Sequence, residues 1–259
     1  MGLDEVASRL TSALPLSCLV FDFRGFGSSD TLPSQPRLEV IPSLQCSDLR
    51  DAVTFAQTTE EVDKDRIGLW GYSFSGVPRL VSRRCRSTRQ SSDQPGTNDG
   101  WMGNLLRLAR PDLVQRLNQG FEMDRISPTA GNPPTMLPVV SADPHGPCDL
   151  PLRVSHEFFS AWEHEKSAWK NELTLRSAEE LVRTSCRSRT SNISRQRLSS
   201  WQSIQNQHSA EHWDEVIRKT QRAQKLCVVD GHHYEMLGSK LDSWHRRQVA
   251  FLSRTLCKA

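Results

Sequence analysis

The pattern of apolar and polar positions predicts that helices and strands alternate along much of the chain. Apolar residues recur at helical spacing in three stretches, residues 3–14, 44–59 and 241–256. Short apolar runs that are typical of buried strands occupy residues 18–23, 67–70 and 226–229. Helices and strands that alternate in this way predict an α/β fold, with a mostly parallel sheet flanked by helices.

The middle of the chain is predicted to be helical on both sides of a proline-rich break. Residues 101–121 carry leucine and valine at helical spacing, and they form either a helical insert that walls an acyl pocket or an ordinary packing helix. Residues 132–151 are rich in proline and are expected to be irregular. Residues 156–181 resume helical character. Their aromatic residues are candidates for core or pocket walls: Phe158, Phe159, Trp162 and Trp169.

The candidate chemistry begins where the apolar run at residues 67–70 ends. The next six residues, GYSFSG, have the pattern of a strand that breaks into a tight turn with Ser73 at its apex. Such a nucleophile elbow lifts the serine hydroxyl clear of the sheet and places the backbone N–H of Phe74 where an oxyanion forms. Ser75 stands where the usual pattern has its last glycine, so an ordinary glycine-serine turn is the alternative.

A serine needs a base to act as a nucleophile at neutral pH. His233 comes after the last expected strand and before the terminal helix, which is where the base of an elbow enzyme is found. It is preferred over His232 because an aromatic and an acidic residue follow it. A pair of surface histidines on a turn is the alternative interpretation.

The acid that would orient this base has only weak candidates. Asp143 follows an apolar stretch but lies in the expected insert, and Asp149 lies nearby. Asp214 sits in a helical stretch, where a surface carboxylate is the ordinary case. None of the three closes an apolar strand in the expected place, so the identity of the acid stays open.

Motifs spread over most of the chain resemble the α/β-hydrolase superfamily. Residues 19–30 (LVFDFRGFGSSD) look like the strand and loop that come before the elbow. Residues 48–52, 62–63 and 66–71 resemble the branch close to dienelactone hydrolases and X-Pro dipeptidyl-peptidase catalytic domains. Residues 169–177 (WKNELTLRS) and 231–235 (GHHYE) look like downstream motifs of fungal polyketide transferases and thiohydrolases.

This resemblance implies an α/β-hydrolase fold, incomplete and with a helical insert. Residues 1–96 would form the first part of the core, with the elbow at 71–76. Residues 97–176 would form a helical, proline-rich, cap-like insert, and residues 177–259 the second part of the core, with an irregular stretch at 183–207. The chain opens in the helix before residues 18–23, so the strand and loop that donate a second oxyanion N–H are expected to be missing. Loss of one such donor costs about 3 kcal/mol of transition-state stabilisation.

The implied activity is serine-dependent acyl hydrolysis or acyl transfer on an ester or thioester. By resemblance, the reaction releases or transfers a polyketide chain in fungal secondary-metabolite biosynthesis, and a carrier domain of a polyketide synthase would present the small acyl substrate. Ser73 is the expected nucleophile, His233 the base and the Phe74 N–H the oxyanion donor. The competing hypothesis is a catalytically impaired or non-catalytic remnant that keeps the elbow by descent.

Two segments conflict with the expected fold. Residues 78–94 and 183–207 are rich in arginine, serine and glutamine and nearly lack apolar periodicity. The resemblance places there the helix and strand after the elbow and the strand that carries the acid. Disordered Ser/Arg tracts that bind RNA are one interpretation, which the scarcity of aromatic residues weakens.

We hypothesise instead that both segments are translated in a shifted reading frame. Permitted codons read from the third base of the Arg195 codon give Pro-Thr-Pro-Leu-Leu-Met-Ala-Val-Asp-Pro-Glu, which resembles the acid-bearing strand. Permitted codons read from the second base of the Arg79 codon give Ala-Ser-Ser-Ala-Ala-Ala-Val-Asp-Pro-Arg-Val-Lys-Ala-Val-Ile, which resembles the helix and strand after the elbow. The coding DNA decides whether these peptides exist.

Composition adds limits on partners and location. A chain of 259 residues with a formal charge of +3 fits one globular domain or a domain with an insert, and the charge is too small to imply nucleic-acid binding. No run approaches the roughly 20 apolar residues that span a bilayer, and no leader opens the chain, so a cytoplasmic protein without a membrane partner is expected. The seven cysteines lack paired metal spacing. Because residues 25–27 also lack the full dinucleotide fingerprint, neither a metal nor an organic cofactor is expected.

Overall fold

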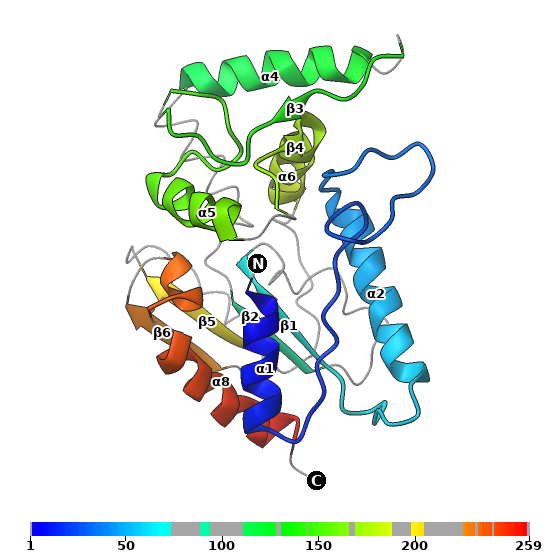
Figure 1. The fold of residues 1–259 in the computed structure, drawn as a ribbon, viewed down its shortest axis with the longest axis vertical. Helices are drawn as coiled ribbons and strands as arrows, with labels where there is room; N and C mark the ends of the chain where they lie inside the picture. Colours follow the sequence, from blue (N-terminus) through cyan, green and yellow to red (C-terminus); the bar gives the residue numbers. More distant parts are fainter. Residues whose placement is uncertain are drawn as a thin grey trace. The chain divides into compact units, whose positions relative to one another are not determined.

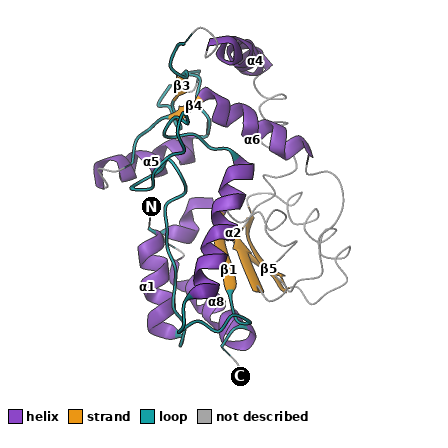
Figure 2. Cartoon of the chain, turned by 90° about the vertical axis from the view of Figure 1, so that its right-hand side faces the viewer, coloured by secondary structure: helices purple, strands orange, loops and turns teal. Residues whose placement is uncertain are grey.

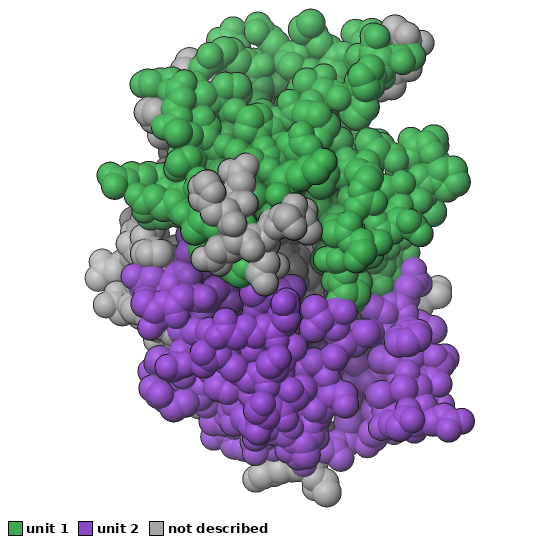
Figure 3. All heavy atoms as spheres, in the orientation of Figure 1, with its two compact units in different colours: residues 1, 21–48, 98–189 green, residues 2–20, 49–97, 190–259 purple. Residues whose placement is uncertain are grey.

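The computed structural model describes most of the chain in two compact units (Figure 3). The described residues are 2–73, 89–93, 111–127, 131–143, 145–165, 169–187, 198–204, 225–230, 233–239 and 241–257. Unit 1 comprises residues 1, 21–48 and 98–189, and unit 2 comprises residues 2–20, 49–97 and 190–259. Each unit has an apolar cluster of its own.

Unit 2 contains a parallel sheet whose four described strands lie in the order β1-β2-β5-β6 (Figure 1). The strands are β1 (Gly68–Tyr72), β2 (Arg89–Asp93), β5 (Leu198–Ile204) and β6 (Lys225–Asp230). Tyr72 is in register with Asp93, and Ile204 is in register with Asp230. Because every neighbouring pair is parallel, the carboxyl ends of all four strands meet at one edge of the sheet.

Two helices from opposite ends of the sequence pack on one face of this sheet, as Figures 1 and 2 show. They are α1 (Leu3–Ala13) and α8 (Leu241–Thr255). The apolar stripes predicted from the sequence point into a shared cluster, whose buried members are Val6, Leu10, Leu14, Met236, Leu241, Trp244, Phe251 and Leu252. Trp244 is fully buried, and its ring meets that of Trp70 on β1 edge-to-face at 5.7 Å. This cluster joins the two helices to the strand that leads into Ser73.

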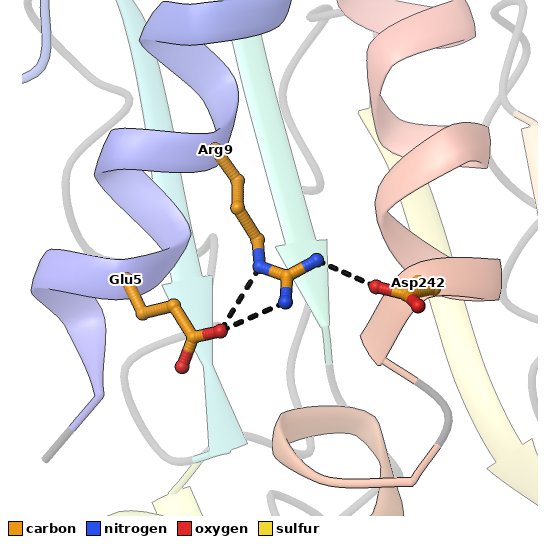
Figure 4. Close-up of polar contacts among 3 residues, drawn as sticks. All are labelled: Glu5, Arg9 and Asp242. Carbon is orange, nitrogen blue, oxygen red and sulfur yellow. Dashed lines mark hydrogen bonds and ion pairs between the residues drawn. The ribbon is translucent and has the colours of Figure 1, made fainter.

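A polar contact also ties α1 to α8 at the surface (Figure 4). The guanidinium of Arg9 donates to Glu5 on its own helix and to Asp242 in the first turn of α8, at 2.9 and 2.5 Å. All three side chains are exposed, so water and salt screen these ion pairs. The apolar cluster beneath them is therefore the main connection between the two helices.

Unit 1 combines helices with a two-stranded antiparallel sheet. The helices are α4 (Pro111–Ile126), α5 (Arg153–Glu165) and α6 (Leu175–Arg187). The strands β3 (Met136–Leu137) and β4 (Leu173–Thr174) pair with Leu137 opposite Leu173. A small cluster of Phe121, Leu137, Leu175 and Ala178 forms between α4, β3 and α6. The remaining helix, α2 (Pro42–Thr58), begins in unit 1 and ends in unit 2.

Buried polar side chains attach the start of α6 to the loop before α2. Thr174 and Ser177 are fully buried, and their hydroxyl oxygens lie 2.8 Å apart. The Ser177 hydroxyl accepts the backbone N–H of Val40 at 2.8 Å, and the Thr174 N–H donates to the carbonyl of Leu38 at 3.0 Å. This network gives a physical reason for the Thr-Leu-Arg-Ser part of the motif at residues 169–177, because the buried hydroxyls must be paired.

The glycine-rich motif at residues 19–30 forms a tight loop around Asp22. Gly27 has φ +49°, and a Cβ at this position would lie 2.1 Å from the Asp22 carboxylate, so only glycine fits. The same carboxylate accepts the backbone N–H of Ser28 at 3.2 Å. Arg24 then forms an ion pair with Asp48 of α2 and donates from Nε at 2.7 Å. The motif thus has a structural role in shaping this loop.

Several predicted elements are confirmed. The helices expected at residues 3–14, 44–59 and 241–256 are present with bounds that differ by one or two residues. The strands expected at residues 67–70 and 226–229 are present as β1 and β6. Residues 132–151 are irregular except for β3. Of the helix predicted at 101–121, residues 101–110 lie outside the described part, and α4 covers the rest.

Two predictions are wrong, and the helical character predicted for residues 156–181 is confirmed only in part. Residues 18–23 form no strand: no described strand pairs with them, and a strand needs a neighbour for its N–H and C=O groups. Leu19 and Val20 are accordingly about half exposed, at 50% and 48%. Residues 156–181 are not one helical stretch, because β4 separates α5 from α6. The stretch 183–207 is not wholly irregular, because α6 continues to Arg187 and β5 lies within it.

The segment at residues 78–94 also contributes a strand, although its sequence has no strand pattern. β2 lies between β1 and β5 and is hydrogen-bonded on both sides, as β5 is between β2 and β6. The position of each segment between two strands, and not its own polarity pattern, accounts for its extended backbone. The interpretation of these segments as disordered tracts is therefore wrong for β2 and β5.

Candidate active site

Ser73 directly follows the last residue of β1 and has a strained backbone. Its φ is +57°, in the left-handed region that non-glycine residues rarely adopt. Gly71, two residues earlier, is buried, whereas Ser73 itself is partly exposed. A serine with a strained backbone directly after a strand is what a nucleophile elbow requires. Phe74, the predicted oxyanion donor, lies outside the described residues.

His233 begins a short 3₁₀-helix, η4 (His233–Leu237), soon after the end of β6. The ring of Tyr72 stacks on the His233 ring with centroids 4.7 Å apart and planes inclined by 17°. The Tyr72 hydroxyl donates to the backbone carbonyl of His233 at 2.5 Å. Tyr72, the residue before Ser73, is therefore in direct contact with the His233 imidazole. His232, the alternative base, lies outside the described residues.

The structure brings the neighbourhoods of the two predicted residues together across the sheet. β1 and β6 are separated by β2 and β5, yet the stacked pair joins the carboxyl end of β1 to the segment after β6. This contact follows from the parallel arrangement, because loops at the same sheet edge can meet even when their strands are not neighbours. The contact of Tyr72 was not predicted, although its place next to Ser73 could have suggested it.

Two of the acid candidates from the sequence, Asp143 and Asp149, lie in unit 1 and not on the parallel sheet. Asp143 is exposed in unit 1, where its carboxylate accepts the backbone N–H of His145 at 2.8 Å in a local turn. Asp149 also lies in unit 1, and burial raises its pKa to about 6. Asp214 lies outside the described residues. Neither Asp143 nor Asp149 is at the end of a described strand of the parallel sheet.

Two other aspartates do end strands at the relevant sheet edge. Asp93 is the last residue of β2 and is in register with Tyr72. Asp230 is the last residue of β6 and precedes His233 by three positions. Sequence reasoning did not name Asp93 because the segment around it has no apolar strand pattern. Its position alone makes Asp93 a candidate for the acid of the site.

The described residues show few features of other kinds of site. No group of three or more His, Cys, Asp or Glu side chains that could hold a metal ion occurs among them. Cys18, Cys46, Cys148 and Cys257 form no disulfide bond. None of the described helices is both long and apolar enough to cross a membrane.

The chain is similar to fungal enzymes of known class. It is 31% identical over 153 residues to polyketide transferase af380 of Aspergillus fumigatus, across 57% of this chain and 47% of that protein. It is 29% identical over 154 residues to a thiohydrolase of Eupenicillium brefeldianum, across 58% of this chain and 46% of that protein. The alignments thus span about half the length of these relatives. No family model matches the chain.

The solved structures show the fold. The α/β hydrolase GrgF from Penicillium sp. sh18 superimposes with a TM-score of 0.75 at 21% identity, over 99% of this chain and 85% of that chain. The DcsB structure superimposes with a TM-score of 0.68 at 18% identity, over 99% of this chain and 86% of that chain. These matches confirm the predicted fold class.

Proposed function

We propose, from the α/β-hydrolase fold of this chain and its similarity to fungal polyketide transferases and thiohydrolases, that it is a serine-dependent acyl hydrolase or acyltransferase. The observation that carries the proposal is the pairing of two features at one sheet edge. Ser73 follows β1 in a left-handed conformation, and His233 stacks on the residue next to it. Strain at a serine beside a held imidazole is typical of an activated nucleophile.

The proposed reaction has two steps. The Ser73 oxygen attacks the acyl carbonyl while His233 takes the hydroxyl proton, and the oxyanion is held by the backbone N–H of Phe74. The bond from the carbonyl carbon to the leaving sulfur or oxygen then breaks, and His233 gives its proton to the leaving group. Water or an alcohol attacks the acyl-enzyme in the second step. The bond between the acyl carbon and the Ser73 oxygen then breaks, and the proton of the water or alcohol passes through His233 to that oxygen, which restores the free enzyme.

A polyketide thioester is the proposed substrate class, because the relatives are named polyketide transferase and thiohydrolase. A carrier domain of a polyketide synthase is the proposed source of the acyl chain. Cysteines that form no disulfide bond, as at Cys18, Cys148 and Cys257, fit a reducing compartment such as the cytoplasm, which is the proposed location. No Asp or Glu occurs between residues 181 and 210, where the resemblance places the strand that carries the triad acid. This absence favours a second candidate function, that of a catalytically impaired remnant.

Labelling with a fluorophosphonate probe tests the proposal. We expect the folded protein to be labelled and Ser73→Ala to lose the label. Ser34→Ala is the matched control, because Ser34 is also left-handed, with φ +66°, but lies in an exposed loop. His233→Gln should slow labelling by about three to four orders of magnitude, because it removes the base and keeps a side chain of similar reach. Equal labelling of Ser73→Ala and the parent chain would contradict the proposal, and a folded parent that takes no label would favour the remnant.

A further inference from the structure

Both tyrosines of the chain contact the candidate base, His233. The sequence contains two tyrosines, Tyr72 and Tyr234. The Tyr72 ring stacks on the imidazole, with centroids 4.7 Å apart and planes inclined by 17°. The Tyr234 ring meets the same imidazole edge-on, at 5.1 Å and 73°. An imidazole that is in contact with one ring by its face and with another by an edge has fewer accessible orientations than one on an open turn.

Tyr72 holds the histidine at two points. Besides the ring contact, its hydroxyl donates to the backbone carbonyl of His233 at 2.5 Å. One side chain therefore restrains both the backbone from which the imidazole extends and the plane in which the ring lies. Because Tyr72 and His233 are partly buried, water competes less for this hydrogen bond than it would at an open surface.

The backbone of Tyr72 is in turn fixed by the sheet. Tyr72 is the last residue of β1 and is in register with Asp93 of β2. The next residue is Ser73, whose left-handed backbone has a φ of +57°. The strands β1 and β6 are separated by two others, yet Tyr72 is bonded covalently to Ser73 and stacked on His233. It therefore links the candidate nucleophile to the candidate base through a single residue.

We propose that Tyr72 is a positioning residue, which sets the place of the His233 imidazole relative to Ser73 and stabilises the charge that the imidazole gains. This role rests on the proposed function of Ser73 and His233. When the serine hydroxyl gives its proton to the imidazole, a positive charge forms on a ring whose centroid lies 4.7 Å from that of Tyr72. The face of a tyrosine ring attracts a cation within about 6 Å. Because this attraction is stronger for the imidazolium than for the neutral imidazole, it lowers the barrier to proton transfer.

Nuclear magnetic resonance of the whole chain with ¹³C-labelled tyrosine rings tests the contact. Two tyrosines give two sets of ring signals, which single Tyr→Phe variants assign. We expect His233→Gln to shift the Tyr72 signals, because the ring current of the stacked imidazole is lost. His245→Gln is the matched control, since His245 lies near Arg9 of α1 and its loss should leave the Tyr72 signals unchanged. Unchanged Tyr72 signals in His233→Gln would overturn the inference, whether or not Ser73 reacts.

The rate of fluorophosphonate labelling at Ser73 tests the role. Tyr72→Phe keeps the stacked ring but loses the hydrogen bond to the His233 carbonyl, and it should lower the maximum labelling rate by less than about tenfold. Tyr72→Leu loses both contacts and should lower that rate by about 10–100-fold. The probe concentration that gives half the maximum rate should stay the same, because Tyr72 acts through His233 and not on the probe. Equal maximum rates in the parent chain and both variants, each shown to be folded by circular dichroism, would overturn the inference.

The same substitutions in a His233→Gln background separate positioning from a general effect on the fold. A residue that acts through His233 has no further effect once the imidazole is gone, so Tyr72→Leu should leave the residual labelling rate unchanged there. An equal loss in both backgrounds would show that Tyr72 only supports the fold around Ser73, and would overturn the inference. If Tyr72→Leu does not fold, Tyr72→Phe in the two backgrounds gives the same comparison. Labelling that survives Ser73→Ala would instead contradict the proposed function and remove the positioning role with it, whereas the tyrosine signals would still show the contact.

Discussion

Each of the two units is stabilised internally by a different kind of interaction. Unit 2 depends on an apolar cluster between α1, α8 and β1, and within the described residues it leaves the buried Nε1 atoms of Trp70 and Trp244 and the amide of Gln248 unpaired. Unit 1 has a smaller apolar cluster, and its buried hydroxyls at Thr174 and Ser177 are hydrogen-bonded. Unit 2 should therefore respond most to loss of apolar volume, and unit 1 to loss of hydrogen bonds or to changes of charge.

Trp244→Ala should have the largest effect on stability. The side chain is fully buried against Trp70, so its removal leaves a large cavity and should lower the free energy of unfolding of unit 2 by about 3–5 kcal/mol. Urea unfolding followed by circular dichroism measures the change. Phe55→Ala is the matched control, because Phe55 is 62% exposed and its loss should change stability by less than about 0.5 kcal/mol. Similar losses in both variants would contradict the assignment of the main core to this cluster.

Asp149→Asn should stabilise unit 1 at neutral pH. Burial raises the folded-state pKa of Asp149 to about 6, above the value of about 3.9 in an unfolded chain. The ionised form therefore destabilises the fold above pH 6, and this penalty is relieved as the pH falls from about 6 to about 4. The asparagine variant should gain up to about 2 kcal/mol near pH 7.5, because Asp149 is partly exposed and solvent screens its charge, and it should show a flatter pH dependence between pH 4 and 6.

Thermal unfolding at a series of pH values measures this difference. Asp143→Asn is the control, since Asp143 lies on the same irregular segment but is exposed. A parent protein whose Tm falls on acidification from pH 6 to pH 4, with Asp149→Asn behaving in the same way, would show that another group dominates the titration of unit 1.

Thr174→Val should cost about 2 kcal/mol, because it keeps the shape of the side chain but removes a fully buried hydroxyl from the network with Ser177. Thr174→Ser retains the hydroxyl and is the matched variant. It should lose less stability than valine in chemical denaturation. If valine were the more stable of the two, apolar packing and not hydrogen bonding would hold this part of unit 1.

The presence or absence of a local apolar pattern decides which elements the sequence could predict. α1, α8, β1 and β6 carry the apolar patterns that packing on a sheet requires, so their bounds were predicted within a few residues. β2 and β5 lack such patterns and could be placed only from their partners in the sheet. β4 has two residues, and polar contacts near it involve Glu39 and Val40, more than 130 positions away, which no periodicity indicates.

The residues of the candidate site also divide into those with a local sequence signal and those without one. Ser73 and His233 were predicted because each follows an apolar strand, which is a local signal. The stacking of Tyr72 on His233 joins residues 161 positions apart, and it could be seen only once the strands were placed. Asp93 stayed unrecognised as a possible acid position, because a segment without an apolar run gives no indication of where a strand ends.

Gln248→Leu should have the smallest effect and the opposite sign. Gln248 lies on the buried face of α8 with 1% of its surface exposed, and its amide has no hydrogen-bond partner in the described part of the chain. An apolar side chain of similar volume removes this desolvation penalty and should raise the stability of unit 2 by about 1 kcal/mol. Gln248→Glu should lower stability instead, because it buries a charge among apolar side chains. Urea midpoints for the three proteins measure both changes. A destabilised leucine variant would show that the amide is paired in solution, and unit 2 would then depend on buried hydrogen bonds as unit 1 does.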